Sequence, residues 1–234
     1  VTATGVVDPD YGAYQFTFDG TNSVTNDGLI EGDLVGVWQE VGGFGANSIT
    51  NTGTIEGFAE QGILVAGGFT GTSSFGGAGG TVRGGTVGLQ IESVGGDIVV
   101  GGSNDITGFT QEGVLLQQFG NSLGNIDFTA TGGSVTGFTA GLSIESDGAG
   151  AITVDSGADI TGQTLEGIRV VNSAVSEDIG SIRIDTQAGT TTSGTTFGIF
   201  SDAAFATGGT TMQIGGDVSA ITADAVFASS FTDA

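Results

Sequence analysis

The chain has 234 residues, of which 26 are acidic and three basic, and it contains no cysteine, histidine or lysine. Its net charge of −23 opposes binding to nucleic acid or to an anionic membrane surface, because both would repel it. The missing residue types exclude disulfides, thiolate metal sites and Cys- or His-based catalysis. Apolar residues make up 38% of the chain, which suffices for a core, but no apolar run approaches the ~20 residues that cross a bilayer. We therefore expect no membrane insertion by this segment.

Short strand-like phrases follow one another from the N-terminus, beginning with YQFTF (14–18), SVTN (23–26) and LIEG (29–32). A glycine then precedes a further apolar phrase, and this glycine recurs every 25 to 31 residues, with alanine in the eighth copy. The residue after it is aliphatic in all eight copies. These aliphatic residues are Val37, Ile63, Leu89, Val114, Leu142, Ile168, Ile199 and Val226. The position two residues further on is also mostly apolar, with lapses at Gln39 and Ser201.

Two further apolar columns accompany the first in each repeat. One lies seven or eight residues earlier and is usually followed by a polar residue and a glycine. Its members are Ile30, Ile55, Val82, Ile106, Val135, Ile160, Thr192 and Val218. The other falls between repeats, in phrases such as VTN (24–26), ITN (49–51), IDF (126–128) and ITV (152–154). Each phrase alternates apolar and polar residues, which is typical of a strand with one buried face.

A regular period of about 27 residues is typical of repeat architectures. No segment has a 3.6-residue pattern, and the 47 glycines would destabilise helices. Three short strands per repeat, joined at glycine-rich corners, instead predict an all-β fold, a parallel β-helix or solenoid of about eight rungs. We expect it to be one segment over residues 1–234 and part of a longer chain or fibre. Insertions are expected at corners, in 67–80 and 171–181.

The phrases SVTNDGLIEG (23–32) and SITNTGTIEG (48–57), with later DITG and SVTG starts, resemble the passenger repeats of bacterial autotransporters and related large surface adhesins. The resemblance covers roughly residues 14 to 229. It implies a right-handed β-helix that is exported through the outer membrane and lies at the bacterial cell surface or outside the cell. It also implies a stalk, adhesin or fibre subunit without catalysis, with a host or cell-surface glycan or protein as a partner.

The alternation turns one column of large apolar residues outward on the predicted front strands. Its apolar members are Trp38, Leu64, Leu115, Phe200 and Phe227. Such a line exceeds the exposed apolar area usual for a soluble monomer, so either another segment covers it or it contacts a partner. Strand-like ends without polar caps, YQFTF (14–18) and DAVFASSF (224–231), add the expectation of self-association, end to end or laterally.

A carbohydrate-active β-helix enzyme or a phage-type tailspike is the alternative. Glu92 and Glu145 occupy equivalent positions two rungs apart with Gln117 between them, roughly 10 Å by strand spacing, which touches the range of inverting glycosidases. Any acidic solenoid contains carboxylate pairs at such a spacing, so this pair is weak support for catalysis. Arg83, Arg169 and Arg183 lie on different repeats and in different columns, which favours surface arginines over a catalytic base. We therefore expect no enzyme.

Calcium is the ligand that this composition favours, since it prefers oxygen ligands. The acidic clusters are VDPD (7–10), SEDIG (176–180) and GGD at 95–97 and 215–217. The nine-residue period of calcium-binding repeats is missing, and a solvated corner is the favoured explanation of each cluster. An outward Ser/Thr column, which includes Thr107, Thr136 and Thr161, is expected to form a side-chain hydrogen-bond ladder.

Overall fold

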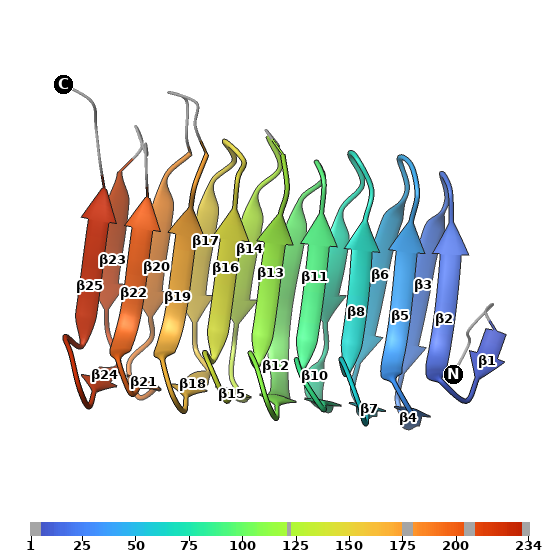
Figure 1. Cartoon of the computed structure of the whole chain (residues 1–234), viewed down its shortest axis with the longest axis horizontal. Helices are drawn as coiled ribbons and strands as arrows, with labels where there is room; N and C mark the ends of the chain where they lie inside the picture. The colour runs from blue at the N-terminus through green and yellow to red at the C-terminus, as the bar shows by residue number, and fades with distance from the viewer. Residues whose placement is uncertain (1–5, 121–122, 175–179, 204–208, 231–234) are drawn as a thin grey trace.

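The computed structural model describes residues 6–120, 123–174, 180–203 and 209–230. In these ranges the chain forms 25 β-strands and no helix. No helix long and apolar enough to cross a membrane therefore occurs among these residues. The strands build a rod of eight full turns in which every turn has three sides (Figure 1).

The side nearest the viewer in Figure 1 is the front sheet, and its strands from β2 to β25 run upward. It contains β1 (Val6–Asp8), β2 (Tyr11–Thr17), β5 (Val35–Val41), β8 (Ile63–Gly67), β11 (Leu89–Ser93), β13 (Val114–Gln118), β16 (Leu142–Ser146), β19 (Glu166–Asn172), β22 (Phe197–Ala203) and β25 (Val226–Ser230). All strands from β2 to β25 in this sheet pair in parallel.

The other two sides are a back sheet and a short sheet, the latter along the bottom of Figure 1. The back sheet contains β3 (Thr21–Asn26), β6 (Ala46–Asn51), β9 (Ser73–Gly76), the first half of β12 (Ile98–Gly108), β14 (Ile126–Ala130), β17 (Ile152–Ser156), β20 (Ile182–Thr186) and β23 (Thr210–Ile214). The short sheet contains β4 (Leu29–Gly32), β7 (Thr54–Gly57), β10 (Ala78–Gly84), the second half of β12, β15 (Ser134–Gly137), β18 (Asp159–Gly162), β21 (Thr191–Gly194) and β24 (Asp217–Ala220).

The chain rises through a front strand, crosses at the top to the back sheet, descends, and returns through the short sheet to the next front strand (Figure 1). Each new front strand lies to the left of the previous one, so the coil is right-handed. Neighbouring strands in a sheet are about 4.8 Å apart, which gives a rod of roughly 40 Å over nine parallel front strands. The predicted all-β solenoid of about eight rungs is confirmed.

The three predicted apolar columns form the core. Leu89 pairs with Ile63 on one side and Val114 on the other, and all three are fully buried. The short-sheet column stacks in the same way, with Val82 between Ile55 and Ile106. On the back sheet Phe128 lies between Val100 and Val154. Because each column contributes one apolar side chain per turn, burial is repeated along the rod rather than concentrated in one centre.

Polar side chains also enter the interior of the first turns. Asn26 and Asn51 are fully buried, and Asn26 Nδ2 donates to Asn51 Oδ1 at 2.9 Å. Asn26 also donates to the carbonyl of Thr54 at 3.0 Å, and Asn51 donates to that of Thr81 at 3.2 Å. Gln39, a lapse in the apolar pattern, is likewise buried and donates to Gln15 Oε1 at 2.8 Å. These three side chains therefore use their N–H groups in hydrogen bonds along the rod. Gln39 Oε1 and the hydroxyl of Ser201, the other lapse, are buried without a hydrogen-bond partner in the described ranges.

Replacing Asn51 with leucine is expected to destabilise the protein. The change removes the acceptor of Asn26 and the donor to the Thr81 carbonyl, and each buried group left unpaired costs about 1–3 kcal/mol. Thr50→Leu, at the exposed neighbouring position, is the control. Urea unfolding followed by circular dichroism should give a lower midpoint for Asn51→Leu alone; equal midpoints would show that these hydrogen bonds contribute nothing.

Two parts of the chain differ from the sequence prediction. The stretch 67–80, expected as a corner insertion, contains β9 and the start of β10, and Phe75 continues the back-sheet column between Ile49 and Val100. At the N-terminal end, β1 pairs antiparallel with β2, so the first edge of the front sheet carries a reversed strand instead of lying open. At the other end, Val226 is 39% exposed, whereas its equivalents in earlier turns are buried.

Candidate functional site

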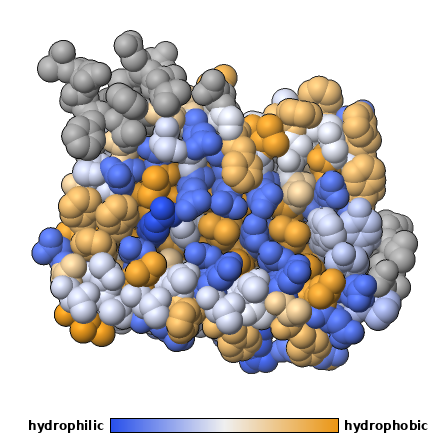
Figure 2. All heavy atoms as spheres, in the orientation of Figure 1, coloured by the Kyte–Doolittle hydropathy of each residue, from blue (hydrophilic) through white to orange (hydrophobic). Residues whose placement is uncertain are grey.

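The predicted outward column lies on the front sheet in a single register. Trp38 pairs with Leu64 at one end, and Phe200 pairs with Phe227 at the other. The intervening members, in order, are Gln90, Leu115, Ser143 and Arg169. Figure 2, in the orientation of Figure 1, shows apolar and polar side chains interspersed over this face. The line is therefore divided into apolar segments by polar members.

Aromatic contacts hold both ends of this column. The Trp38 ring lies 5.1 Å from that of Tyr11 and 5.2 Å from that of Tyr14, edge to face in both cases. Burial and the nearby Glu40 raise the pKa of the Tyr14 hydroxyl. Phe200 stacks on Phe227 with 5.2 Å between centroids. Such pairs stabilise the outer face itself, beyond the area that they bury.

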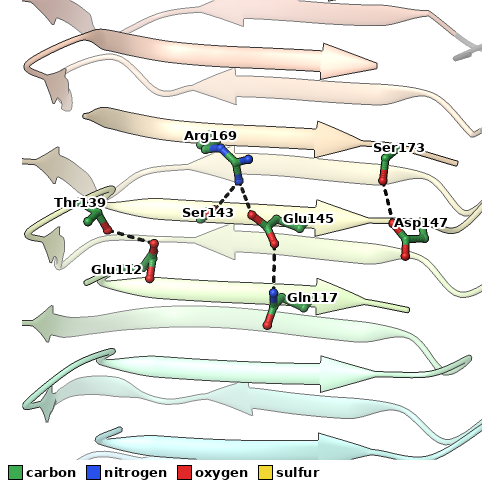
Figure 3. A network of polar contacts seen from close by, with 8 residues as sticks. All are labelled: Glu112, Gln117, Thr139, Ser143, Glu145, Asp147, Arg169 and Ser173. Carbon is green, nitrogen blue, oxygen red and sulfur yellow. Dashed lines mark hydrogen bonds and ion pairs between the residues drawn. The ribbon is translucent and has the colours of Figure 1, made fainter. Parts of the chain in front are cut away.

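A polar network crosses the middle of the front sheet (Figure 3). Arg169 on β19 reaches Glu145 on β16 at 2.5 Å and donates to Ser143 Oγ at 3.2 Å. Glu145 in turn accepts from Gln117 Nε2 on β13 at 3.0 Å. Farther along, Ser173 donates to Asp147 at 2.7 Å. The network links successive turns, as cross-strand pairs do in other sheets.

The carboxylates considered for glycosidase chemistry belong to this ladder. Glu92, Gln117 and Glu145 occupy three successive turns in register, so the predicted two-turn spacing is present. Gln90 Nε2 donates to Glu92 at 2.6 Å, and Gln117 and Arg169 hold Glu145. Both carboxylates thus have neighbours in the sheet that account for their positions.

Each arginine is paired with a carboxylate. Arg83 contacts Glu56 on the preceding turn at 2.7 Å, and Arg169 contacts Glu145. Arg183 pairs with Asp185 on its own strand, which raises the pKa of the guanidinium. Each arginine therefore has a carboxylate partner on the surface of the rod.

Glu166, at the start of β19, is the ionisable group with the least favourable surroundings in this area. Its Oε2 is buried and has no hydrogen-bond partner in the described ranges. Burial raises the pKa of this carboxyl, and the opposing attraction of Arg169 lowers it less. A raised pKa means that the native state holds the proton more tightly than the unfolded state, so stability falls as the pH rises through that interval.

Glu166→Gln is therefore expected to raise the melting temperature at about pH 7, because glutamine cannot ionise. The gain should disappear at about pH 3.5, where the carboxyl is protonated in both states. Glu31→Gln removes the same charge from an exposed position and corrects for the general relief of repulsion. A gain independent of pH, or one matched by the control, would contradict the role of burial.

Two of the hollows on the surface of the described residues contain charged side chains. The corner hollow, of about 490 Å³, lies beside the short sheet and is lined by Glu56, Gly57, Phe58, Arg83, Gly85, Thr107 and Phe109. The back hollow, of about 450 Å³, is lined by Asp155, Arg183, Asp185, Thr186, Gln187, Ala188, Gln213 and Gly215. Asp155 and Asp185 are register partners one turn apart. Neither hollow contains Glu92 or Glu145, the carboxylates considered for glycosidase chemistry, but Arg83 lines the corner hollow and Arg183 lines the back hollow.

Arg83, Thr107 and Arg183 were singled out from the sequence, whereas most of the other residues that line the hollows were not. Part of the signal for the two phenylalanines was nevertheless visible. The phrases IEGF (55–58), ITGF (106–109) and VTGF (135–138) place phenylalanine after a recurring glycine. Phe58 and Phe109 are 60% and 59% exposed. The alternation of apolar and polar residues holds within a strand and stops at a corner. It therefore could not predict whether these two rings point inward or outward. The Ser/Thr column is in register from Thr107 to Ser219. Of the expected hydrogen-bond ladder, the structure shows the link from Ser193 to Thr161, at 3.3 Å.

No group of three or more acidic residues in the described ranges is arranged to hold a metal ion. Asp97, of the GGD phrase, accepts the backbone N–H of Asn125 at 2.8 Å and so stabilises a corner. Asp217 begins β24. Most of SEDIG (176–180) lies outside the described residues, as do the side chains at the start of VDPD (7–10).

Comparison of the chain with protein-family models, with curated proteins and with solved structures finds no match. What the protein does must therefore be argued from its own residues.

Proposed function

We propose that the chain is a rigid, non-catalytic adhesive rod on the outside of a bacterial cell. The observation that carries this proposal is the unbroken parallel pairing of eight turns on three sheets. A solenoid of this kind holds its length because every turn is hydrogen-bonded to the next, and its lateral faces present repeated side chains to a partner. Both properties suit a stalk or adhesin.

Composition supports the location. A chain without cysteine forms no disulfides that would obstruct export in an unfolded state, and the charge of −23 favours solubility outside the cell. The phrases SVTNDGLIEG (23–32) and SITNTGTIEG (48–57) resemble passenger repeats of surface proteins. They now fall on β3–β4 and β6–β7, which stack in register as adjacent turns.

The location is tested by labelling cells of the native organism with an antibody raised against the folded chain. Intact cells should be labelled, and external protease should remove the signal. Labelling only after permeabilisation would refute the surface assignment. Adhesion is tested separately with beads that carry the chain, which should be retained on the organism's natural substratum more strongly than beads that carry albumin.

The back hollow favours a second candidate function, glycoside hydrolysis. Asp155 and Asp185 lie one turn apart, about 4.8 Å by strand spacing, close to the roughly 5–5.5 Å between the carboxyls of retaining glycosidases. Gln187 donates to Asp155 at 3.0 Å, whereas Asp185 Oδ1 is buried without a partner in the described ranges. Release of reducing ends from polysaccharides, abolished by Asp185→Asn, would support hydrolysis over a purely structural role.

A further inference from the structure

The corner hollow is built from three consecutive turns at the point where the chain leaves the short sheet. Gly85 donates its N–H to the carbonyl of Gly57 at 2.9 Å, and Phe109 donates its N–H to that of Gly84 at 3.1 Å. These bonds stack Phe58, Gly85 and Phe109 in one line along the rod. The backbone positions that carry the two phenyl rings thus lie two turns apart, roughly 9.6 Å by strand spacing, and Gly85 places no side chain between them.

The gap between the rings is enforced by the backbone. A Cβ added to Gly85 would lie 2.2 Å from the carbonyl oxygen of Phe58, closer than atoms can approach. No other residue fits there without a shift of the main chain. The rings are also among the most exposed apolar side chains of the described residues, so the core does not account for them. The space beside Gly85 and the exposure of both rings together indicate an open slot between Phe58 and Phe109.

One wall of the slot is polar. Glu56, Arg83 and Thr107 occupy successive turns in register on the outer face of the short sheet. The Glu56–Arg83 pair, at 2.7 Å, fixes a carboxylate acceptor beside guanidinium donors, and 52% of the Arg83 side chain is exposed. The Thr107 hydroxyl both donates and accepts. The hollow therefore offers two apolar rings and a neutralised set of donors and acceptors.

We propose that the corner hollow binds a neutral hexopyranose unit of a glycan. Two carbon contacts of about 3.5–4 Å use most of the ~9.6 Å gap and leave about 2 Å, which a puckered ring with substituents fills better than a flat ring. Sugar hydroxyls would pair with Glu56, Arg83 and Thr107. The charge of −23 disfavours anionic sugars. This inference rests on the proposed adhesive function and names its ligand class.

Affinity electrophoresis in native gels tests the proposal, because the acidic chain migrates strongly. The gels contain dextran, soluble starch, galactomannan or hydroxyethylcellulose as neutral probes, and alginate as the anionic probe. The full chain should be retarded by at least one neutral polysaccharide and not by alginate. Phe58→Ala/Phe109→Ala should raise the dissociation constant of that polysaccharide about tenfold or more. Both rings are exposed, so circular dichroism should be unchanged.

Phe138→Ala is the matched control, since Phe138 follows the same type of glycine and is 44% exposed but does not line the hollow. It should be retarded like the parent. No retardation in any neutral gel, equal retardation of the double variant, or retardation by alginate alone would overturn the proposal. So would concentration-dependent self-association that the double variant abolishes without polysaccharide binding. Labelling of intact cells is unaffected by these variants, so the surface location stands or fails separately.

Discussion

Leu142→Asp is expected to unfold most of the protein at room temperature. Leu142 is fully buried on β16, between Val114 on one turn and Ile168 on the next. An aspartate there must either bury an unpaired charge or stay protonated at a strongly raised pKa, and both cost several kcal/mol. Native domains are stable by only about 5–15 kcal/mol. Circular dichroism and urea unfolding should show loss of β-structure or a large fall in the midpoint.

Thr136→Asp is the matched control, because it adds the same charge at an outward position. Thr136 lies on β15 between Thr107 and Thr161. It should change the midpoint little. Ser143 is unsuitable as a control although it is an outward position. It is only 2% exposed, because the side chain of Arg169 lies over it and donates to its hydroxyl. Similar losses from Leu142→Asp and Thr136→Asp would show that the assigned inward face is wrong.

The sequence predicted the stacking register because burial repeats one apolar residue per turn. Val37 and Ile63, or Ile30 and Ile55, are 26 and 25 residues apart in the chain and directly paired in the sheets. Only the inside of the rod constrains residue type at every turn. The apolar columns were therefore sufficient to predict the fold. They tolerate polar members such as Gln39, which is buried and hydrogen-bonded.

The elements that escaped prediction have weak or absent periodicity. Strand β9 has one large apolar residue, Phe75, and its other inward position is Ser73, which is also buried. Its flanking glycines made it resemble a corner. Strand β1 pairs antiparallel and belongs to no repeat, so no column could include it. Pairing in the sheet, rather than local sequence, determines both strands.

The candidate sites were harder to predict than the fold, because outward positions show no repeated constraint. Alternation identified Trp38 and Leu64 as outward but did not indicate that Tyr11 and Tyr14 pack against Trp38. It gave no reason to pair Asp155 with Asp185 across 30 positions of chain. The chemistry of the surface depends on which side chains meet across turns and at corners. Predicting those contacts requires both the strand register and the geometry of the corners.

The repeat glycines have a different physical cause from the one that glycine-rich corners suggest. Among the described residues positive φ occurs at seven glycines, including Gly77, Gly102 and Gly133. The glycine that precedes each front strand is not one of them. At Gly88, an added Cβ would lie 2.6 Å from the Gly113 carbonyl oxygen and 2.6 Å from Ile106 Cγ2. Close passage of neighbouring turns, rather than an unusual backbone angle, requires glycine at this column.

Gly88→Ala is therefore expected to destabilise the protein by about 1–3 kcal/mol or more, because the backbone of the next turn must move to admit one methyl group. Gly28→Ala makes the same chemical change at an exposed corner where an added Cβ has no atom within 4 Å and φ is not positive. There alanine should stabilise by about 0.4–1 kcal/mol, since it restricts the unfolded chain. Urea midpoints should thus move in opposite directions. A Gly88→Ala midpoint equal to or above that of the parent would mean that neighbouring turns do not approach as closely at this column as the structure places them.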